Sequence, residues 1–501
     1  MISHDLMAPL MFGGLFVFML IGYPVAFSLA AVGLFFGLIG IQLGFFEVAL
    51  LQALPERVYG IMANDLLLAI PFFTFMGAIL ERCGLAEDLL DGMGQLFGPV
   101  RGGLAYAVII VGAILGAITG TVAASVIAMG IIALPVMMRY GYNMRLATGV
   151  IAASGTITQL IPPALVLIVL ADQLGKSVGD MYAGAIGASM VQVLLFCVYV
   201  FALSLLKPDH MPALPKEFRT LTGWPLAAKV LWGMVPSLAL IFLVLGTILM
   251  GLATPTEGGA MGAVGAMVLA ALHKRLTWSL LTQGMETTMR ITSMVIFILV
   301  GSTVFGLIFR GVDGDLWIEH LLTALPGGVT GFLIFVNIFV FVLAFFLDFF
   351  EIAFIIIPLL APVAAKLGID LIWFGVLLGA NMQTSFMHPP FGFALFYLRG
   401  IAPKEVRSSD IYWGALPWVG LQLLLVAILI FWPGLVTSFV DRNVGHEPSK
   451  IEIQIPAPEG EGISEEEKKA DARKSDAEKA SIETEEEKSA DDIQKAFGKS
   501  K

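Results

Sequence analysis

A long apolar segment occurs twice in this chain, and each copy is too long for a single membrane crossing. The first copy runs from Gly102 to Pro163 and the second from Gly327 to Pro390. Three pairs of landmarks lie 227 positions apart, namely Pro135 and Pro362, Gly141 and Gly368, and Pro162 and Pro389. Interrupted hydrophobic segments at matching positions of two halves indicate the binding site of a secondary transporter.

The body of the chain carries few charges. The 501 residues are 58% hydrophobic and 14% charged, and the last 61 hold 17 of the 39 acidic and 11 of the 29 basic residues. The remaining 440 residues are about 9% charged, against roughly a quarter in a soluble protein. The apolar runs are continuous and do not alternate as in a barrel. They therefore predict an all-α polytopic membrane protein, because lipid requires paired backbone groups.

The duplication predicts how the chain is divided. We expect N-terminal scaffold helices over 1–63, a first inverted repeat over 64–206, a cytoplasmic linker and scaffold helix over 207–256, a second inverted repeat over 257–436, and a charged tail, disordered or helical, over 437–501. Each repeat is expected to contain a re-entrant hairpin, at 102–138 and 327–365, and a discontinuous helix, at 146–171 and 370–398. The stretch 6–43 contains Gly22 and Pro24 and is too long for one span, so we expect two short or strongly tilted helices there.

Basic residues predict the orientation of the spans. With the N-terminus outside, cytoplasmic loops receive most of the Lys and Arg residues, including Arg82, Arg101, Arg139, Arg145, Lys207, Lys274, Arg275 and Arg399. The short external loops receive Arg57, Lys176, Arg310 and Lys366. This asymmetry follows the positive-inside rule, and it predicts that the two long segments have opposite orientations and that the charged tail lies outside.

Each long segment is interrupted near its middle. A straight helix from Gly103 to Met138 would be about 54 Å long, against ~30 Å of hydrocarbon, so it must fold back or protrude. Gly and Thr cluster halfway along it, in G-A-I-T-G-T ending at Thr121. The middle of the second copy reads F-L-D-F-F-E and ends at Glu351. We therefore predict two re-entrant hairpins with tips at these positions.

Two polar islands follow the hairpins inside otherwise apolar spans. They read A-A-S-G-T-I-T-Q-L-I-P-P over 152–163 and G-A-N-M-Q-T-S-F-M-H-P-P over 379–390. Each double proline removes amide donors and frees upstream carbonyls, which must line a buried or watery cavity. Such oxygens suit a hard cation, and half-helix N-termini favour carboxylates. Small polar residues can also serve only close helix packing, but four repeat-matched breaks favour two cation sites flanking one substrate site.

Two carboxylates lie within the second hairpin. Asp348 and Glu351 are three residues apart and share a helical face. Carboxylates inside a membrane are expected to be functional, so this pair is a candidate to ligate a cation or relay protons. The alternative is structural pairing with a basic residue such as Arg310 or Arg290. For His388, a packing or hydrogen-bonding role is favoured over proton transfer.

Six motifs together give the chain a family resemblance. They are I-G-Y-P-V-A-F from Ile21, A-I-P-F-F-T-F-M-G from Ala69, G-A-I-T-G-T from Gly116, A-T-P-T-E-G-G-A from Ala253, D-F-F-E-I from Asp348, and P-P-F-G-F-A-L-F-Y-L-R-G from Pro389. In this order, over about 9–436, they resemble the large membrane subunit of tripartite ATP-independent periplasmic (TRAP) transporters. The last two motifs are similar to those of the branch associated with 2-oxo acids, mannitol-type polyols and chloroaromatic acids.

The resemblance implies an elevator-type, sodium-driven importer of organic acids in the bacterial inner membrane. A periplasmic binding protein would deliver the substrate, and a separate small four-span membrane subunit would brace the scaffold. The hairpins and broken helices would form the moving domain. The resemblance implies no cofactor, with Na⁺, or H⁺ in its place, as the coupling ion.

The resemblance also maps a site onto the hairpin tips and the polar islands. The residues expected to bind the coupling cation are Thr119, Gly120, Thr121, Ser154, Gly155, Thr156, Asp348, Glu351, Asn381, Gln383 and Thr384. The residues expected to contact the substrate are Thr121, Ser125, Thr158, Gln159, Pro162, Ser385, His388 and Pro389. The acidic pair departs from relatives with fewer charges there, whereas T-G-T at the first tip retains hydroxyls where many relatives have serines.

Three other functions are compatible with parts of the pattern. A standalone divalent-anion/sodium symporter would share the inverted hairpins without a binding protein. An intramembrane enzyme would need a nucleophile and base, or metal ligands, and the six His and two Cys residues show no ligand spacing. A channel or scaffold would have no coupled transport. The pattern favours the coupled transporter.

Overall fold

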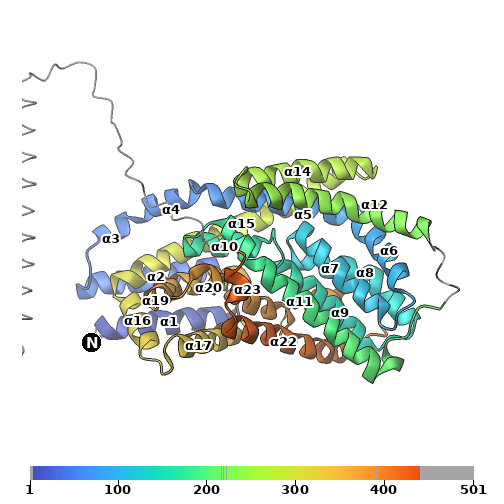
Figure 1. The fold of residues 1–501 in the computed structure, drawn as a ribbon. Coiled ribbons are helices and arrows are strands. Elements are labelled where there is room, and N and C mark those ends of the chain that lie inside the picture. Colours follow the sequence, from blue (N-terminus) through green and yellow to red (C-terminus); the bar gives the residue numbers. More distant parts are fainter. Residues whose placement is uncertain are drawn as a thin grey trace, which may run out of the picture. The chain divides into compact units, whose positions relative to one another are not determined.

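All regular elements in the described part of the chain are helices, which confirms the all-α prediction (Figure 1). The computed structural model describes residues 4–440, apart from residues 216, 218, 220, 222 and 391 and the side chains of Asp5 and Leu20. Of the described helices, seven are long and apolar enough to cross a membrane, or up to nine if each bent pair forms one span. The charged tail predicted over 437–501 lies outside the described residues from position 441 onward.

The N-terminal region forms two helices, as predicted, followed by two short ones. These are α1 (His4–Ile21), α2 (Val25–Leu43), α3 (Ala49–Gln52) and α4 (Leu54–Met62). The chain turns between α1 and α2 at Gly22, whose φ of 88° favours glycine, and α2 begins after Pro24. A Cβ atom on Gly33 of α2 would lie 3.0 Å from the Cα atom of Phe305, so α2 and the helix that carries Phe305 touch at backbone distance.

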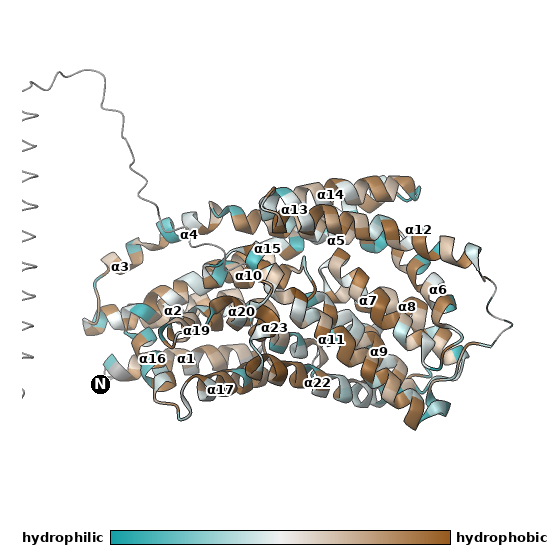
Figure 2. Ribbon diagram, viewed as in Figure 1, coloured by the Kyte–Doolittle hydropathy of each residue, from teal (hydrophilic) through white to brown (hydrophobic). Residues whose placement is uncertain are grey.

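A group of helices covers residues 224–311, which span the predicted scaffold helix and the start of the predicted second repeat. These are α12 (Trp224–Ile241), a π-helical turn (Phe242–Gly246), α13 (Thr247–Leu249), α14 (Pro255–Leu272) and α15 (Trp278–Gly311). Figure 2 shows hydrophobic residues along much of α12 and α14, and the side chains of Trp232 and Phe242 are each 72% exposed. Large exposed apolar side chains suit contact with lipid or a membrane partner.

The first repeat contains a helical hairpin and an interrupted helix. Its elements are α5 (Asp65–Arg82), α6 (Leu85–Phe97), α7 (Gly103–Thr119), α8 (Val122–Arg139), α9 (Met144–Thr156), η1 (Ile157–Gln159), α10 (Leu165–Leu174), α11 (Val178–Leu206) and η2 (Pro208–His210). The amide of Leu104 donates to the hydroxyl of Tyr142 at 3.3 Å, so the two ends of the hairpin meet. The chain reverses at Gly120, with φ of 62°, and Thr121.

The second repeat has the same order of elements. They are α16 (Gly314–Thr323), α17 (Gly328–Leu343), α18 (Phe349–Glu351), a π-helical turn (Ile352–Ile356), α19 (Ile357–Lys366), α20 (Leu371–Met382), η6 (Gln383–Met387), α21 (Phe393–Ile401), α22 (Ser408–Phe431) and α23 (Gly434–Thr437). Phe335 and Phe339 of α17 line a cavity of about 110 Å³ together with Ile356 and Leu360 of the returning leg. The two legs therefore line a common cavity.

Helix starts and turns match between the repeats. α8 and α18 begin 227 residues apart, and so do α9 and α20. Asn143 caps α9 and Asp370 caps α20, each through a side-chain oxygen that accepts from two backbone amides. The turn glycines before them, Gly141 and Gly368, have φ of 78° and 73°. The duplication seen in the sequence thus extends to the caps and turns.

The two hairpins lie toward opposite ends of the described part of the chain. In Figure 1, α7 and α8 are drawn near one end, and α16, α17 and α19 near the other, with α10 and α20 between them. This arrangement agrees with an inverted repeat. Re-entry of the hairpins from opposite membrane faces, and the division into domains, stay predictions.

Candidate functional site

Both interrupted helices break just before their double prolines. α9 continues as a 3₁₀ turn and ends ahead of Pro162 and Pro163, and α20 continues as a 3₁₀ turn and ends ahead of Pro389 and Pro390. Both proline pairs are joined by cis peptide bonds. The polar islands of the sequence therefore form two breaks, defined here as 154–163 (first break) and 381–390 (second break).

Three predicted residues form a hydroxyl cluster where the first hairpin tip meets the first break. The Oγ1 of Thr119 lies 3.0 Å from the Oγ of Ser125, and the Oγ1 of Thr158 lies 3.2 Å from the same Ser125 oxygen. All three side chains are at most 2% exposed. They come from α7, α8 and η1. Folding thus brings the hydroxyl of Thr158 in the first break against that of Ser125, which lies 33 positions earlier in the chain.

Glycines let the hairpin approach the first break closely. A Cβ on Gly112 would lie 2.7 Å from the Cβ of Ser154, and one on Gly116 would lie 2.9 Å from the Cα of Thr158. Gly155 lies against Val126 of α8, where a Cβ would come within 2.2 Å of Cγ2. These distances exclude larger residues unless the neighbours shift. Helix α5 approaches the hairpin tip just as closely, since a Cβ on its Gly77 would lie 2.0 Å from the carbonyl oxygen of Thr119.

Buried amides organise the second break. Asn381 donates from Nδ2 to the backbone oxygen of Asn337 at 2.7 Å and to its side-chain oxygen at 3.0 Å. Gln383 pairs with Gln192 of α11 through bonds of 2.7 Å and 3.4 Å. Asn337 and Gln192 were not predicted. Their only signal in the sequence is a single amide within an apolar helix, and such a residue is costly to bury without a partner.

Several predicted residues have buried polar atoms without a hydrogen bond among the described residues. They are the Oγ of Ser154, Oε1 of Gln159, Oδ1 of Asn381, Oγ1 of Thr384, Oγ of Ser385 and both ring nitrogens of His388. Five of these seven atoms are oxygens, and all seven lie in the two breaks. Buried polar atoms are normally satisfied, so this concentration fits a place for an ion, water or a polar substrate.

Asp348 and Glu351 cap the returning leg of the second hairpin. The amide of Glu351 donates to Oδ1 of Asp348, and the amide of Asp348 donates to Oε2 of Glu351, each at 2.9 Å. This reciprocal capping box explains their three-residue spacing. Arg290, proposed as a structural partner, instead pairs with Glu286 at 2.6 Å.

The remaining predicted residues take varied positions. Thr121 begins α8 after Gly120, and both are half-buried at the tip. The His388 ring stacks on Phe345 with centroids 4.0 Å apart and meets Phe341 edge-on at 4.4 Å, which is the environment of a packing histidine. Among the described residues, no hydrogen bond joins the first tip to Asp348 or Glu351.

One side chain outside the predicted set touches both breaks. Gln422 of α22 donates from Nε2 to the Oγ1 of Thr156 at 2.9 Å and lies 3.7 Å from the sulfur of Met387. The Thr156 hydroxyl is itself 3.6 Å from that sulfur. The two breaks therefore meet at Thr156 and Met387.

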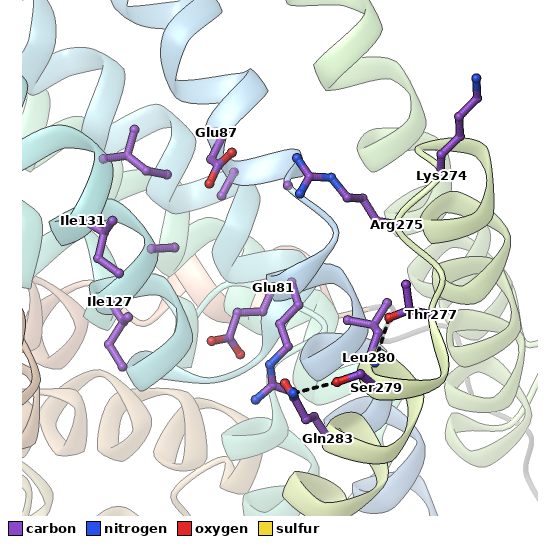
Figure 3. Close-up of a pocket in the computed structure, with 15 residues that line it drawn as sticks. Glu81, Glu87, Ile127, Ile131, Lys274, Arg275, Thr277, Ser279, Leu280 and Gln283 are labelled. Atoms are coloured by element: carbon purple, nitrogen blue, oxygen red, sulfur yellow. Dashed lines mark hydrogen bonds between the residues drawn. The ribbon is translucent and has the colours of Figure 1, made fainter.

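A charged crevice lies apart from the breaks. Its volume is about 620 Å³, and it is bounded by the end of α5, the start of α6, the outer face of α8 and the loop between α14 and α15. Figure 3 shows Glu81 and Glu87 on one side and Arg275 and Lys274 on the other, with Ile131 of α8 at its wall. The sequence predicts that the basic residues face the cytoplasm. None of the predicted site residues lines this crevice.

Comparisons with known proteins agree with one another. The family model described as "Tripartite ATP-independent periplasmic transporter, DctM component" matches residues 12–435. The chain is 30% identical over 384 residues to the C4-dicarboxylate TRAP transporter large permease protein DctM of Pseudomonas aeruginosa, over 76% of this chain and 88% of that protein. It is 29% identical over 456 residues to the protein of the same name from Vibrio cholerae, over 86% and 96%. The crystal structure of the Alcanivorax borkumensis YdaH transporter resembles the fold, with a TM-score of 0.55 and 16% identity over 77% of this chain and 88% of that one.

Proposed function

The chain belongs to the DctM-component family of tripartite ATP-independent periplasmic transporters, and from this premise we propose that it imports an organic acid across the bacterial inner membrane under a sodium gradient. The substrate is a carboxylate such as a 2-oxo or hydroxy acid, delivered by a periplasmic binding protein. Family membership makes the chain a transporter component and not an enzyme. The more specific branch suggested by the sequence stays a prediction.

The hydroxyl cluster at the first tip is the observation that carries this proposal. The hydroxyl oxygens of Thr119 and Thr158 each lie within 3.2 Å of the buried hydroxyl oxygen of Ser125. Hard cations prefer such oxygen ligands, and unpaired oxygens of the adjacent break can complete a coordination shell. Sodium is a transported ion in this proposal, bound and released in each cycle.

A carboxylate substrate is supported by two independent features. Two relatives are named for the transport of C4-dicarboxylates. Within this chain, α8 begins at the tip and α10 begins just after the first break, and helix N-termini favour negative charge. The polar atoms of Gln159 and Ser385 are buried there and can orient the rest of the molecule.

The partners follow from the tripartite family. We propose a separate small four-span subunit, packed on the apolar exposed faces of α12 to α15, and a soluble periplasmic binding protein. In this arrangement the hairpins and interrupted helices move against these helices as an elevator. The N-terminus and the charged tail lie on the periplasmic side.

Uptake in proteoliposomes tests the proposal against a standalone symporter. The chain is reconstituted with the small subunit encoded beside it, and labelled organic acids are offered with and without the neighbouring exported receptor. We expect uptake that needs both an inward sodium gradient and the receptor. Sodium-dependent uptake without any receptor would establish the standalone symporter. Uptake that depends on neither a sodium gradient nor a proton gradient would establish a channel.

A further inference from the structure

Two buried glutamines occupy corresponding places in the two repeats. Gln192 lies in α11, the second helix after the first break, and Gln422 lies in α22, the second helix after the second break. Both side chains are 0% exposed within strongly apolar helices. A carboxamide buried in such surroundings is costly unless its hydrogen bonds are made.

Each glutamine contacts the break of the other repeat. Gln192 donates from Nε2 to Oε1 of Gln383 in the second break at 2.7 Å, and receives a 3.4 Å bond in return. Gln422 donates from Nε2 to Oγ1 of Thr156 in the first break at 2.9 Å. Thr156 and Gln383 are themselves 227 positions apart, the spacing of the duplication. Gln192 and Gln422 are 230 positions apart, as are the starts of α11 and α22, so the two glutamines occupy the same place in their helices. The two contacts therefore correspond between the repeats.

We propose that Gln192 and Gln422 are a reciprocal pair of positioning residues, through which α11 and α22 each hold the break of the other repeat in place. Their amides fix the two breaks against each other, so that oxygens from both repeats form one site. In this crossed pattern, the glutamine of each repeat bonds to the break of the other repeat. The pattern distinguishes the role from ordinary packing, because a repeat by itself would lack the glutamine that contacts its break.

The effect that we expect on sodium binding rests on the proposed function. If oxygens of both breaks act together, loosening one contact weakens cation binding more than it slows the moving domain. The two contacts also differ in strength. Gln383 loses its reciprocal partner when Gln192 is replaced, whereas Thr156 keeps a 2.8 Å bond to the carbonyl of Ala153 when Gln422 is replaced. Replacing Gln192 should therefore have the larger effect.

Hydrogen–deuterium exchange of the full-length protein in lipid nanodiscs tests the geometry without any substrate. Gln192→Met and Gln422→Met remove the amide at similar volume. Gln192→Met should accelerate exchange about tenfold in 381–388, and Gln422→Met should do so, to a smaller extent, in 154–161. Gln52→Ala, on an exposed position of α3, is the matched control. Acceleration confined to the variant's own repeat, or no acceleration, overturns the proposal.

Two further measurements complete the test. If a Met variant does not fold, Gln→Leu at the same position also removes the carboxamide with an apolar side chain of different shape, with the same crossed pattern expected. In the uptake assay, the sodium concentration for half-maximal rate should rise about tenfold while the maximal rate changes little. If the variants show the crossed exchange pattern but uptake by the wild type does not depend on sodium, the positioning role stands and sodium coupling is refuted. A fall in maximal rate alone would refute the role in cation binding.

Discussion

At the scale of single residues, the first tip depends on hydroxyls that already have backbone partners. Thr119 donates to the carbonyl of Leu115 at 2.9 Å, and Thr158 donates to that of Gly155 at 2.6 Å. Their lone pairs consequently remain oriented toward Ser125 and the space beside it. Ser125 is the only one of the three without a backbone acceptor among its described bonds, so its proton is free to reorient when a cation binds.

Ser125→Ala should therefore weaken sodium activation. We expect the sodium concentration for half-maximal uptake to rise about tenfold, because one ligand and the link between Thr119 and Thr158 are lost. Stability should fall by about 1 kcal/mol. Thr282→Val removes a comparable hydroxyl on exposed α15 and serves as control. Unchanged sodium dependence in Ser125→Ala would exclude the cluster as a coupling site.

A second residue-scale prediction concerns an ion pair away from the breaks. Asp91 of α6 pairs with Lys229 of α12. Partial burial raises the pKa of the Asp91 carboxyl, but hydrogen bonds from Lys229 and Gln95 lower it more, so the pKa lies below its ordinary value. The stabilisation is present above the unfolded-state pKa of about 3.9 and is lost as pH falls through the lower folded-state pKa.

Thermal unfolding of Asp91→Asn checks the direction of this pH dependence. The wild type should be more stable than the variant at pH 7 by less than about 1 kcal/mol, since the pair is half-exposed, and the difference should shrink below about pH 4. Asp88→Asn, an exposed position on the same helix, should show no such trend. A difference that grows on acidification would contradict the assignment.

At the scale of elements, the second hairpin shows why a carboxylate pair can have two roles. The capping box uses Oδ1 of Asp348 and Oε2 of Glu351 to satisfy two amides at the start of the returning leg. Its charge is not needed for that role, because asparagine caps helices as well as aspartate does. Capping and coupling are therefore separable by substitution.

Asp348→Asn and Asp348→Ala separate them. The alanine variant should lose about 1 kcal/mol of stability, and the asparagine variant should lose little. If the carboxylate couples transport, Asp348→Asn should assemble normally and abolish sodium-driven counterflow. Full counterflow in that variant would leave Asp348 with the capping role alone.

The sequence predicts the breaks better than what surrounds them. The double prolines and the Gly–Thr tip mark irregular backbone locally, so both interrupted helices and the first tip are visible from residue types. Gln192 and Gln422 are not, because a lone amide in an apolar run reveals no partner 191 or 266 positions away. The capping box was seen only as a shared helical face, since its geometry depends on the turn before Asp348.

At the scale of the whole molecule, the matched caps and turns argue that one supersecondary unit was used twice. Positions after the two hairpins correspond closely, down to Asn143 and Asp370 at the next helix starts. If the repeats are inverted in the membrane, corresponding positions must face opposite compartments.

Cysteine labelling checks that inversion. Met138 and Ala365 are 227 residues apart near the ends of α8 and α19. In a background with Cys83 and Cys197 replaced, a membrane-impermeant maleimide should label Met138→Cys only from the cytoplasmic side and Ala365→Cys only from the periplasmic side. Labelling of both from one side would refute the inverted arrangement.

The glycine of α5 that touches the first tip has a consequence for motion. With no side chain at Gly77, the carbonyl of Thr119 lies directly against a helix backbone. If the tip slides along α5, as the proposed elevator motion requires, a single methyl group at that position would obstruct it. Gly77→Ala should then still bind the proposed coupling ion and fail to carry it across.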